Sequence, residues 1–224
     1  MLDWSFSFGG LTVGDSPAIM YSNLDLVSLP DVRSNDLALI QRDGLWPGDD
    51  YYGGRTVNIS LRIQGRDAEE FSHAVNSVQA AFRLGANGET PFAFRIPGLC
   101  NGRTAYFNAR TRRRSSPLDM AFARLYCAFE IELFATDPFI YASEETSVTV
   151  RKGTTARVMV AGSREVKPTV TYTGLTSPKL TDSITGQVLP AAPVLSPGDH
   201  FLSLTDSGSN ADGAAQLKWR DTWV

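Results

Sequence analysis

Strict alternation of apolar and polar residues is the strongest pattern in this chain. From Val57 to Ile63 every second residue is Val, Ile or Leu, and the residues between them are polar. Because successive side chains of a strand point to opposite faces, this pattern predicts a strand with one buried face. The longest alternation covers residues 122–135. Its length exceeds the usual strand of about 3 to 10 residues, so we expect a bend, a bulge or an extension beyond the sheet.

The N-terminal residues predict a hairpin. Trp4, Phe6 and Phe8 alternate with serines, and Gly9 and Gly10 then interrupt the pattern. Glycine adopts the tight turns that other residues avoid, so we expect the chain to turn back here, with the three aromatic side chains on one face.

One segment, residues 67–84, has the period of an α-helix. Asp67 and Glu70 have the spacing of a capping box at its start, and Gly85 marks its end. His73 falls on the face opposite the apolar stripe, so we expect it to be solvated. The residues of the stripe are Phe71, Val75, Val78 and Phe82.

From residue 143 onward, short strand patterns alternate with turn signals at intervals of about ten residues, which predicts a small antiparallel β-sandwich. The sequence therefore predicts a mainly β protein with one α-helix. An α+β domain covers residues 1–142, and a β-sandwich domain covers residues 143–224.

The type of basic residue changes near the same boundary. All 13 basic residues before residue 143 are arginines, whereas all four lysines follow it. Arginine suits packed interfaces because its planar guanidinium is weakly hydrated, and lysine prefers solvent. This favours an interface-rich first domain, with biased codon usage as the alternative explanation. The net charge of −3 is too small to favour nucleic acid or a membrane surface as the partner.

The sequence lacks the motifs of common enzyme classes. It contains no phosphate-binding loop, no dinucleotide-binding glycine pattern, no Cys-x-x-Cys and no pair of histidines at ligand spacing. We expect Cys100 and Cys127 to be buried apolar side chains and His200 to be a turn residue. No catalytic residue, cofactor or metal site is predicted, and we expect a soluble chain without a signal peptide or membrane span.

Glu130 and Glu132 are the strongest enzymatic candidates. They share one face of the long predicted strand at a separation of roughly 7 Å, which a glycoside hydrolase could use. The opposite face is wholly apolar. Two glutamates on the solvated face of a half-buried strand explain the pattern better, so we expect no enzyme.

Arg112, Arg113 and Arg114 belong to the strongest cluster of charge. Six arginines and one acidic residue lie between Arg103 and Arg124. No aromatic residue interleaves with the central arginines to stack on bases, which disfavours nucleic acid. The cluster predicts a surface that docks on an acidic partner or a neighbouring subunit, and a solvated loop remains the alternative.

Several short motifs together resemble the distal tail proteins (Dit) of long-tailed bacteriophages. They are Asp43-Gly44, the stretch from Tyr52 to Val57, a single helix, and the "ATDPFIY" stretch from Ala135 to Tyr141. The segments "KPTVTYTG" and "PKLTDSITGQVL" are similar to the galectin-like domain of that family.

The resemblance implies a structural protein at the distal end of the virion tail, made in the bacterial cytoplasm. It implies a hexameric ring that joins the tail-tube protein to the tail hub, or baseplate, with receptor-binding or fibre proteins as further partners. The tape measure protein and DNA would pass through its channel. Strong positive charge would retain passing DNA, so we do not expect Arg112 to Arg114 to line the channel. We expect the C-terminal domain, residues 143–224, to be too small for the large carbohydrate-binding insertions of some relatives, which argues against direct receptor binding.

In this context the loop before the first long strand is a candidate inter-subunit contact. Its aspartates lack the alternating oxygen ligands of a calcium loop, and a plain turn remains the alternative. Large aromatic side chains, carboxylates for arginine partners and Arg55 at the strand start lie close together. The candidate contact residues are Trp46, Asp49, Asp50, Tyr51, Tyr52 and Arg55.

A carbohydrate-binding module is the second hypothesis. Tyr172, Trp219 or Trp223 would then stack on a sugar ring. Aromatic side chains in the core of the sandwich are the alternative explanation for these three residues.

Overall fold

The computed structural model describes residues 1–85, 88–210 and 212–224. Over these residues the chain is mostly β-strand with one α-helix, which confirms the predicted fold class. It divides into two compact units. Unit 1 comprises Met1–Pro97 and Ala105–Phe139, and unit 2 comprises Gly98–Thr104 and Ile140–Val224.

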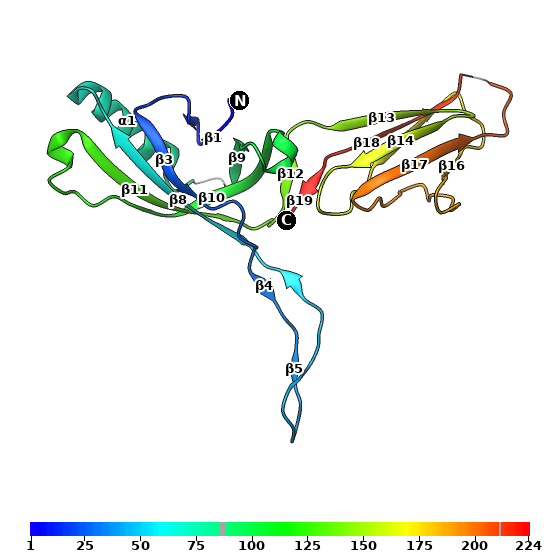
Figure 1. The fold of residues 1–224 in the computed structure, drawn as a ribbon, viewed down its shortest axis with the longest axis horizontal. Helices are drawn as coiled ribbons and strands as arrows, with labels where there is room; N and C mark the ends of the chain where they lie inside the picture. The colour runs from blue at the N-terminus through cyan, green and yellow to red at the C-terminus, as the bar shows by residue number, and fades with distance from the viewer. Residues whose placement is uncertain (86–87, 211) are drawn as a thin grey trace. The chain divides into compact units, whose positions relative to one another are not determined.

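A curved antiparallel sheet forms the body of unit 1 (Figure 1). Its described strands follow the order β2-β1-β9-β10-β11-β8-β3. Their bounds are β1 Ser5–Phe8, β2 Leu11–Val13, β3 Ile19–Leu24, β8 Arg55–Gln64, β9 Thr90–Arg95, β10 Ala105–Ser115 and β11 Tyr126–Ala135.

Strand β8 confirms the alternation that predicted it. Its apolar side chains from Val57 to Ile63 are fully buried, and its neighbour β11 pairs with it in unbroken register from Tyr126 to Ala135. Burying one whole face of two long strands contributes to the hydrophobic stabilisation of this unit.

The longest predicted strand is shorter than its sequence pattern. Residues Phe122–Arg124 form the 3-10 helix η2, and Leu125 takes a left-handed conformation with φ of 58° before β11 begins. The alternation at 122–125 was therefore a wrong prediction of strand, and the chain bends at Leu125, in line with the bend expected from the length of the pattern. A β-bulge lies in the neighbouring strand β10, between Thr111 and Arg113.

Aromatic side chains fill the space enclosed by the curved sheet. The ring of Phe92 stacks on Phe6 at 4.9 Å and on Phe107 at 5.1 Å between ring centroids. Phe6 on β1 also lies 5.9 Å from Tyr21 on β3, near the other end of the sheet. The sheet therefore curls until its two ends approach each other across the core.

The predicted hairpin joins β1 and β2, and Phe6 and Phe8 point into the core. Trp4 differs from the prediction: it precedes the strand, has a positive φ of 59° and is 58% exposed. Gly9 also has a positive φ, of 57°, and a Cβ atom there would lie 2.3 Å from the carbonyl oxygen of Ala81. The turn therefore requires glycine.

Helix α1 covers Ala68–Ala81, within the predicted range. The Asp67 carboxylate accepts a hydrogen bond from the Glu70 backbone N–H, as an N-cap does. Glu70 does not complete a capping box; its carboxylate instead binds the backbone and side chain of Arg66. The apolar face of the helix is buried, and His73 is exposed as expected.

Between β3 and β8 the chain forms a two-stranded extension, residues 25–54, which we call the arm (Figure 1). Four short strands form its two ladders. Strand β4 (Val32–Arg33) pairs with β7 (Tyr51–Tyr52), and β5 (Leu37–Ala38) pairs with β6 (Leu45–Trp46).

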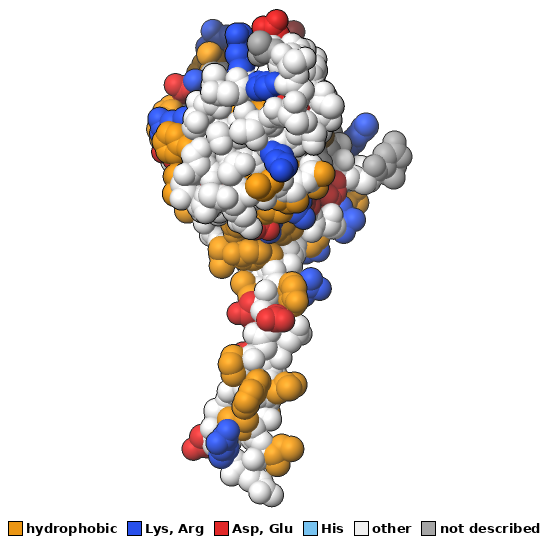
Figure 2. Space-filling model, turned by 90° about the vertical axis from the view of Figure 1, so that its right-hand side faces the viewer, with side chains coloured by type: hydrophobic (Ala, Val, Ile, Leu, Met, Phe, Trp, Pro, Cys, Tyr) orange, Lys and Arg blue, Asp and Glu red, His pale blue; other side chains and the backbone are white. Residues whose placement is uncertain are grey.

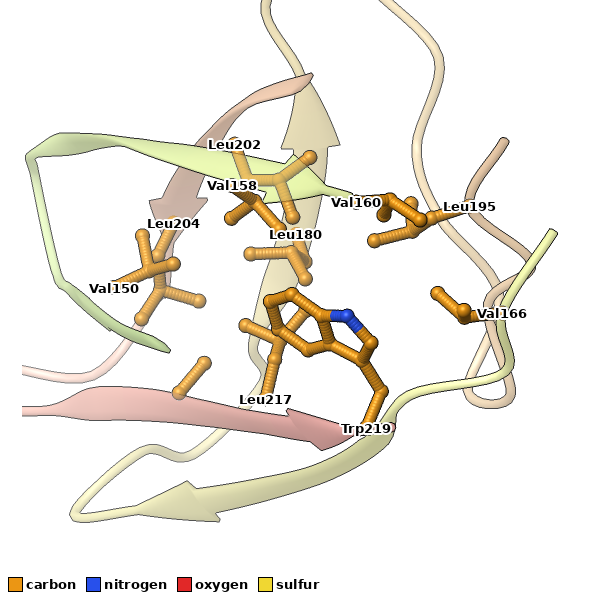
Figure 3. Close-up of a cluster of buried hydrophobic side chains, with 11 residues drawn as sticks. Val150, Val158, Val160, Val166, Leu180, Leu195, Leu202, Leu204, Leu217 and Trp219 are labelled. Atoms are coloured by element: carbon orange, nitrogen blue, oxygen red, sulfur yellow. The ribbon is translucent and has the colours of Figure 1, made fainter. Parts of the chain in front are cut away.

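Unit 2 is a small antiparallel sandwich. Its two described three-stranded sheets have the orders β13-β18-β15 and β14-β17-β16. Side chains from both sheets form one hydrophobic core, in which Trp219 lies beside Leu217 and Leu180 (Figure 3). The strand bounds are β13 Thr146–Arg151, β14 Thr155–Val160, β15 Thr169–Thr173, β16 Lys179–Asp182, β17 Gly198–Thr205 and β18 Ala214–Trp219.

Two further segments complete unit 2. Strand β12 (Ile140–Ala142) pairs with β19 (Thr222–Trp223). The segment Gly98–Thr104, which contains the 3-10 helix η1 (Cys100–Gly102), joins this unit although the sequence placed it in the first domain. Arg103 of that segment forms an ion pair of 2.8 Å with Asp221, a contact remote in sequence that no local pattern indicates.

Candidate functional site

The arm exposes many large apolar side chains for so small a segment. Figure 2 shows hydrophobic side chains, in orange, along the length of the arm. An isolated two-stranded ribbon is marginally stable, and soluble monomers rarely expose a large contiguous apolar patch. The arm is therefore the surface of unit 1 best suited to bind another protein. Its exposed large apolar residues, 39% to 89% accessible, are Val27, Leu29, Val32, Leu37, Ile40, Leu45, Trp46, Tyr51 and Tyr52.

Carboxylates accompany these apolar side chains. The arm contains six aspartates and two arginines, a net charge of −4. Asp49 and Asp50 are exposed side by side, directly before Tyr51. Asp36 has a structural role, because its carboxylate accepts a hydrogen bond from the Gly48 N–H at 2.8 Å. That bond, followed by one from Ser34, lowers the pKa of Asp36.

Arg55 lies where the arm joins the sheet, a place we call the root of the arm. Its side chain is not part of the outer surface of the arm. It is 1% exposed, which corrects its prediction as a contact with a neighbouring subunit. Its guanidinium donates to the carbonyl of Pro138 at 2.8 Å, and to the carbonyls of Ser28 and Leu26 at 3.1 and 3.4 Å. It thus ties both strands of the arm to the end of β11.

Gly54 and Arg112 both contact the aromatic ring of Phe134. A Cβ atom at Gly54 would lie 2.2 Å from the ring of Phe134, so the backbone approaches that ring as closely as glycine permits. The guanidinium carbon of Arg112 lies 3.3 Å from the centroid of the ring, a cation–π contact. The structure therefore places Arg112 of the predicted arginine cluster at the root of the arm.

The arginines of the cluster differ in role. Arg114 donates to the carbonyls of Gln79 and Phe82, at 2.5 and 3.5 Å, and so satisfies acceptors at the end of α1. This use within the chain makes Arg114 a helix-capping residue, which the sequence did not predict. Arg113 is exposed on β10 opposite Glu132 of β11.

A hollow of about 680 Å³ lies between the end of α1 and strand β10. Phe8, Leu84 and Thr111 line it together with Arg83 and Arg110. Arg83, Leu84 and Arg110 are exposed, so the hollow offers both apolar contact and positive charge.

The three residues predicted to stack on a sugar differ in their exposure to solvent. Trp219 is 4% exposed and its indole N–H donates to Asp221 at 3.0 Å, so a sugar cannot stack on it in this fold. Trp219 is a core residue, the alternative that the sequence left open. Tyr172 is 36% exposed and its pKa is raised by burial, and Trp223 is half-buried.

The residues considered for catalysis lie apart from both described cavities. Glu130 is on the polar face of β11 and accepts a hydrogen bond of 2.6 Å from Ser60. His200 is held between Asp182 and the carbonyl of Ser196, at 3.5 and 2.8 Å. Within the described ranges no cluster of three or more His, Cys, Asp or Glu residues is placed to bind a metal. Over the same ranges no helix is long and apolar enough to span a membrane.

The sequence predicted a loop at residues 42–54, and the two-stranded form of the arm was not predicted. Residues 25–41 have no regular alternation, but Asp43-Gly44 between two apolar stretches is a hairpin signature that indicates where the chain turns back. The buried position of Arg55 had no comparable signal, because its acceptors are backbone carbonyls distant in sequence.

Comparison with solved structures gives a match over the full chain. The structure of the Dit protein (gp 19.1) of phage SPP1 is described as a paradigm of the hub adsorption apparatus in phages that infect Gram-positive bacteria. It matches 98% of this chain, over 99% of its own, with a TM-score of 0.66. The chain has the fold of a phage distal tail protein. Sequence identity is 11%, so the likeness concerns the fold. No protein-family model and no curated protein matches the chain.

Proposed function

We propose that this protein is a phage distal tail protein, a structural component of the tail tip that assembles into a ring. The proposal rests on the exposed apolar surface of the arm. Its exposed apolar side chains need a partner, and a second copy of the chain is the partner that a ring supplies. The likeness to the SPP1 protein over nearly the whole chain supports the role at the tail.

In this proposal unit 1 forms the ring and Trp46, Tyr51, Asp49 and Asp50 contact the neighbouring copy. Unit 2 decorates the ring. The resemblance suggests six copies around a channel for the tape measure protein and DNA. The tail-tube protein and the tail hub bind the ring, with receptor-binding or fibre proteins as further partners, and the protein acts in the virion without enzymatic activity.

The proposal is tested by sizing the purified full chain by light scattering and by negative-stain imaging. We expect rings of uniform size, alone or after addition of the tail-tube protein. Labelled antibody should mark the distal tip of virion tails. A variant in which residues 30–53 are replaced by a short Gly-Ser turn is the control, and should fold but remain monomeric. A protein that stays monomeric with its tail partners and is absent from virion tails would contradict the proposal.

A further inference from the structure

We propose that the arm of one copy docks on the hollow at the end of α1 in the next copy. This inference rests on the proposed ring and identifies the surface that receives the arm. The receiving surface, which we call the basic hollow, is defined by Phe8, Arg83, Leu84, Arg110 and Thr111.

The arm sets the chemistry that its partner must have. It is apolar and acidic at once, with Trp46 62% exposed and Tyr51 55% exposed beside Asp49 and Asp50. A complementary surface must therefore offer apolar side chains to cover the aromatic rings and cations to pair with the carboxylates. Charge complementarity also suppresses wrong partners, because like charges brought together destabilise a contact strongly.

The basic hollow has both properties. Leu84 is 79% exposed at its rim, and Phe8 contributes apolar surface to its wall. Arg83 and Arg110 supply the positive charge. Among the residues that the structure describes, no carboxylate lies within 4 Å of either guanidinium, so their charge is available to a partner.

Two other arginines of unit 1, Arg66 and Arg95, are paired with acidic side chains. Arg66 binds Glu70 at 3.0 Å, and Arg95 binds Asp3 at 2.6 Å. In the basic hollow, positive charge without a carboxylate partner lies next to the exposed apolar side chain of Leu84. An acidic, apolar segment is the partner that this combination favours.

The contact joins two different surfaces of the chain. Each copy can insert its arm into one neighbour and receive the arm of another, which is a head-to-tail arrangement. Repetition of such a contact builds a ring when the rotation between copies closes. A single type of contact between copies can thus build the whole ring.

Charge reversal tests the pairing directly. The first variant carries Asp49→Lys and Asp50→Lys in the arm, and the second carries Arg83→Glu and Arg110→Glu in the basic hollow. Each variant alone places like charges at every contact. We expect the protein concentration needed for half-assembly, measured by light scattering on the full chain, to rise at least about tenfold for each.

An equal mixture of the two variants should restore assembly. The lysines of the first variant then face the glutamates of the second, and the native aspartates of the second face the native arginines of the first. A ring with an even number of copies can close when the two variants alternate around it. The matched control is Arg62→Glu, an exposed arginine on β8 outside the hollow, which should assemble as the wild type does.

The outcomes separate this inference from the proposed function. If both charge-reversed variants assemble normally while the variant without the arm does not, the ring stands and the basic hollow is not its receiving surface. The same conclusion follows if one variant alone fails, or if both fail and their mixture stays unassembled although each is folded by circular dichroism. Failure of the wild type to assemble with its tail partners would remove the proposed function and this inference together.

Discussion

At the scale of single residues, Asp221 connects distant parts of unit 2. Its side chain is completely buried. It accepts hydrogen bonds from Arg103 at 2.8 Å, Thr146 at 3.3 Å, and the Ala161 N–H and the Trp219 indole at 3.0 Å each. A buried carboxylate is stable when its lone pairs are satisfied in this way, and leaving its donors without an acceptor is costly.

Replacing Asp221 by Asn should lower the free energy of unfolding of the protein by about 2 to 3 kcal/mol, because hydrogen bonds to a charged acceptor are lost at a buried site. Urea denaturation followed by circular dichroism measures the change. Glu145→Gln, at an exposed position, is the matched control and should be near neutral. Equal stability of the two variants would show that the carboxylate is dispensable.

Asp182 predicts a dependence of stability on pH. Burial raises its pKa, but hydrogen bonds from the Ile184 N–H, His200 and the Thr185 N–H outweigh burial and bring the pKa below its ordinary value. The folded state thus favours the carboxylate. Its contribution is present above the unfolded pKa, about 3.9, and is lost as the pH falls through the lower folded value.

We therefore expect the wild type to lose stability between about pH 5 and pH 2 more steeply than Asp182→Asn does. The substituted protein should be less stable at pH 6, with a smaller difference in strong acid. Thermal unfolding across this pH range measures both. Parallel curves for the two proteins would refute the role of this carboxylate.

At the scale of elements, the arm depends on its root. Its two ladders have two residue pairs each, so fixed geometry must come from where the arm meets the sheet. Arg55 provides that connection through the carbonyls of Pro138, Ser28 and Leu26. Its position at the first residue of β8 couples the arm to the strongest ladder of the unit.

Arg55→Lys should destabilise the protein by about 2 kcal/mol, because an ammonium group cannot reproduce the fork of the guanidinium. It should also increase proteolytic cleavage within residues 25–54. Arg62→Lys on the exposed face of the same strand is the control. Thermal unfolding and limited proteolysis test the prediction, which fails if the two variants behave alike.

Elements with a regular period were predictable, and those shaped by a few specific contacts were not. Strand β8 and helix α1 followed from their alternation and from Asp67. The start of β11 did not, because Leu125 turns left-handed and η2 replaces the first residues of the pattern. The aromatic residues and aspartates predicted as contacts are exposed on the arm, whereas burial of Arg55 and Trp219 depends on folding.

At the scale of the whole molecule, assembly should depend on the exposed aromatic side chains of the arm. Tyr52 lies edge-on to Phe139, with 6.0 Å between ring centroids, and so also serves its own chain. Trp46 and Tyr51 are more exposed and are the sharper probes.

The double substitution Trp46→Ala and Tyr51→Ala should raise the concentration for half-assembly by about tenfold or more, since buried aromatic anchors dominate interface energies. The thermal stability of the monomer should change little. Ile184→Ala, which removes an exposed apolar side chain in unit 2, is the control. Light scattering measures assembly, and unchanged assembly of the double variant would show that the aromatic side chains do not form the contact.

The sequence by itself determined the fold class, the helix and the strands of the sandwich, because periodic burial is written into the order of residues. It also placed aromatic and acidic residues in the segment that became one strand of the arm. Tertiary structure decided what each candidate does. Arg55 and Trp219 are buried, Arg114 caps a helix, and the basic hollow combines Arg83 with Arg110. These roles depend on contacts between residues far apart in the chain, which no local pattern specifies.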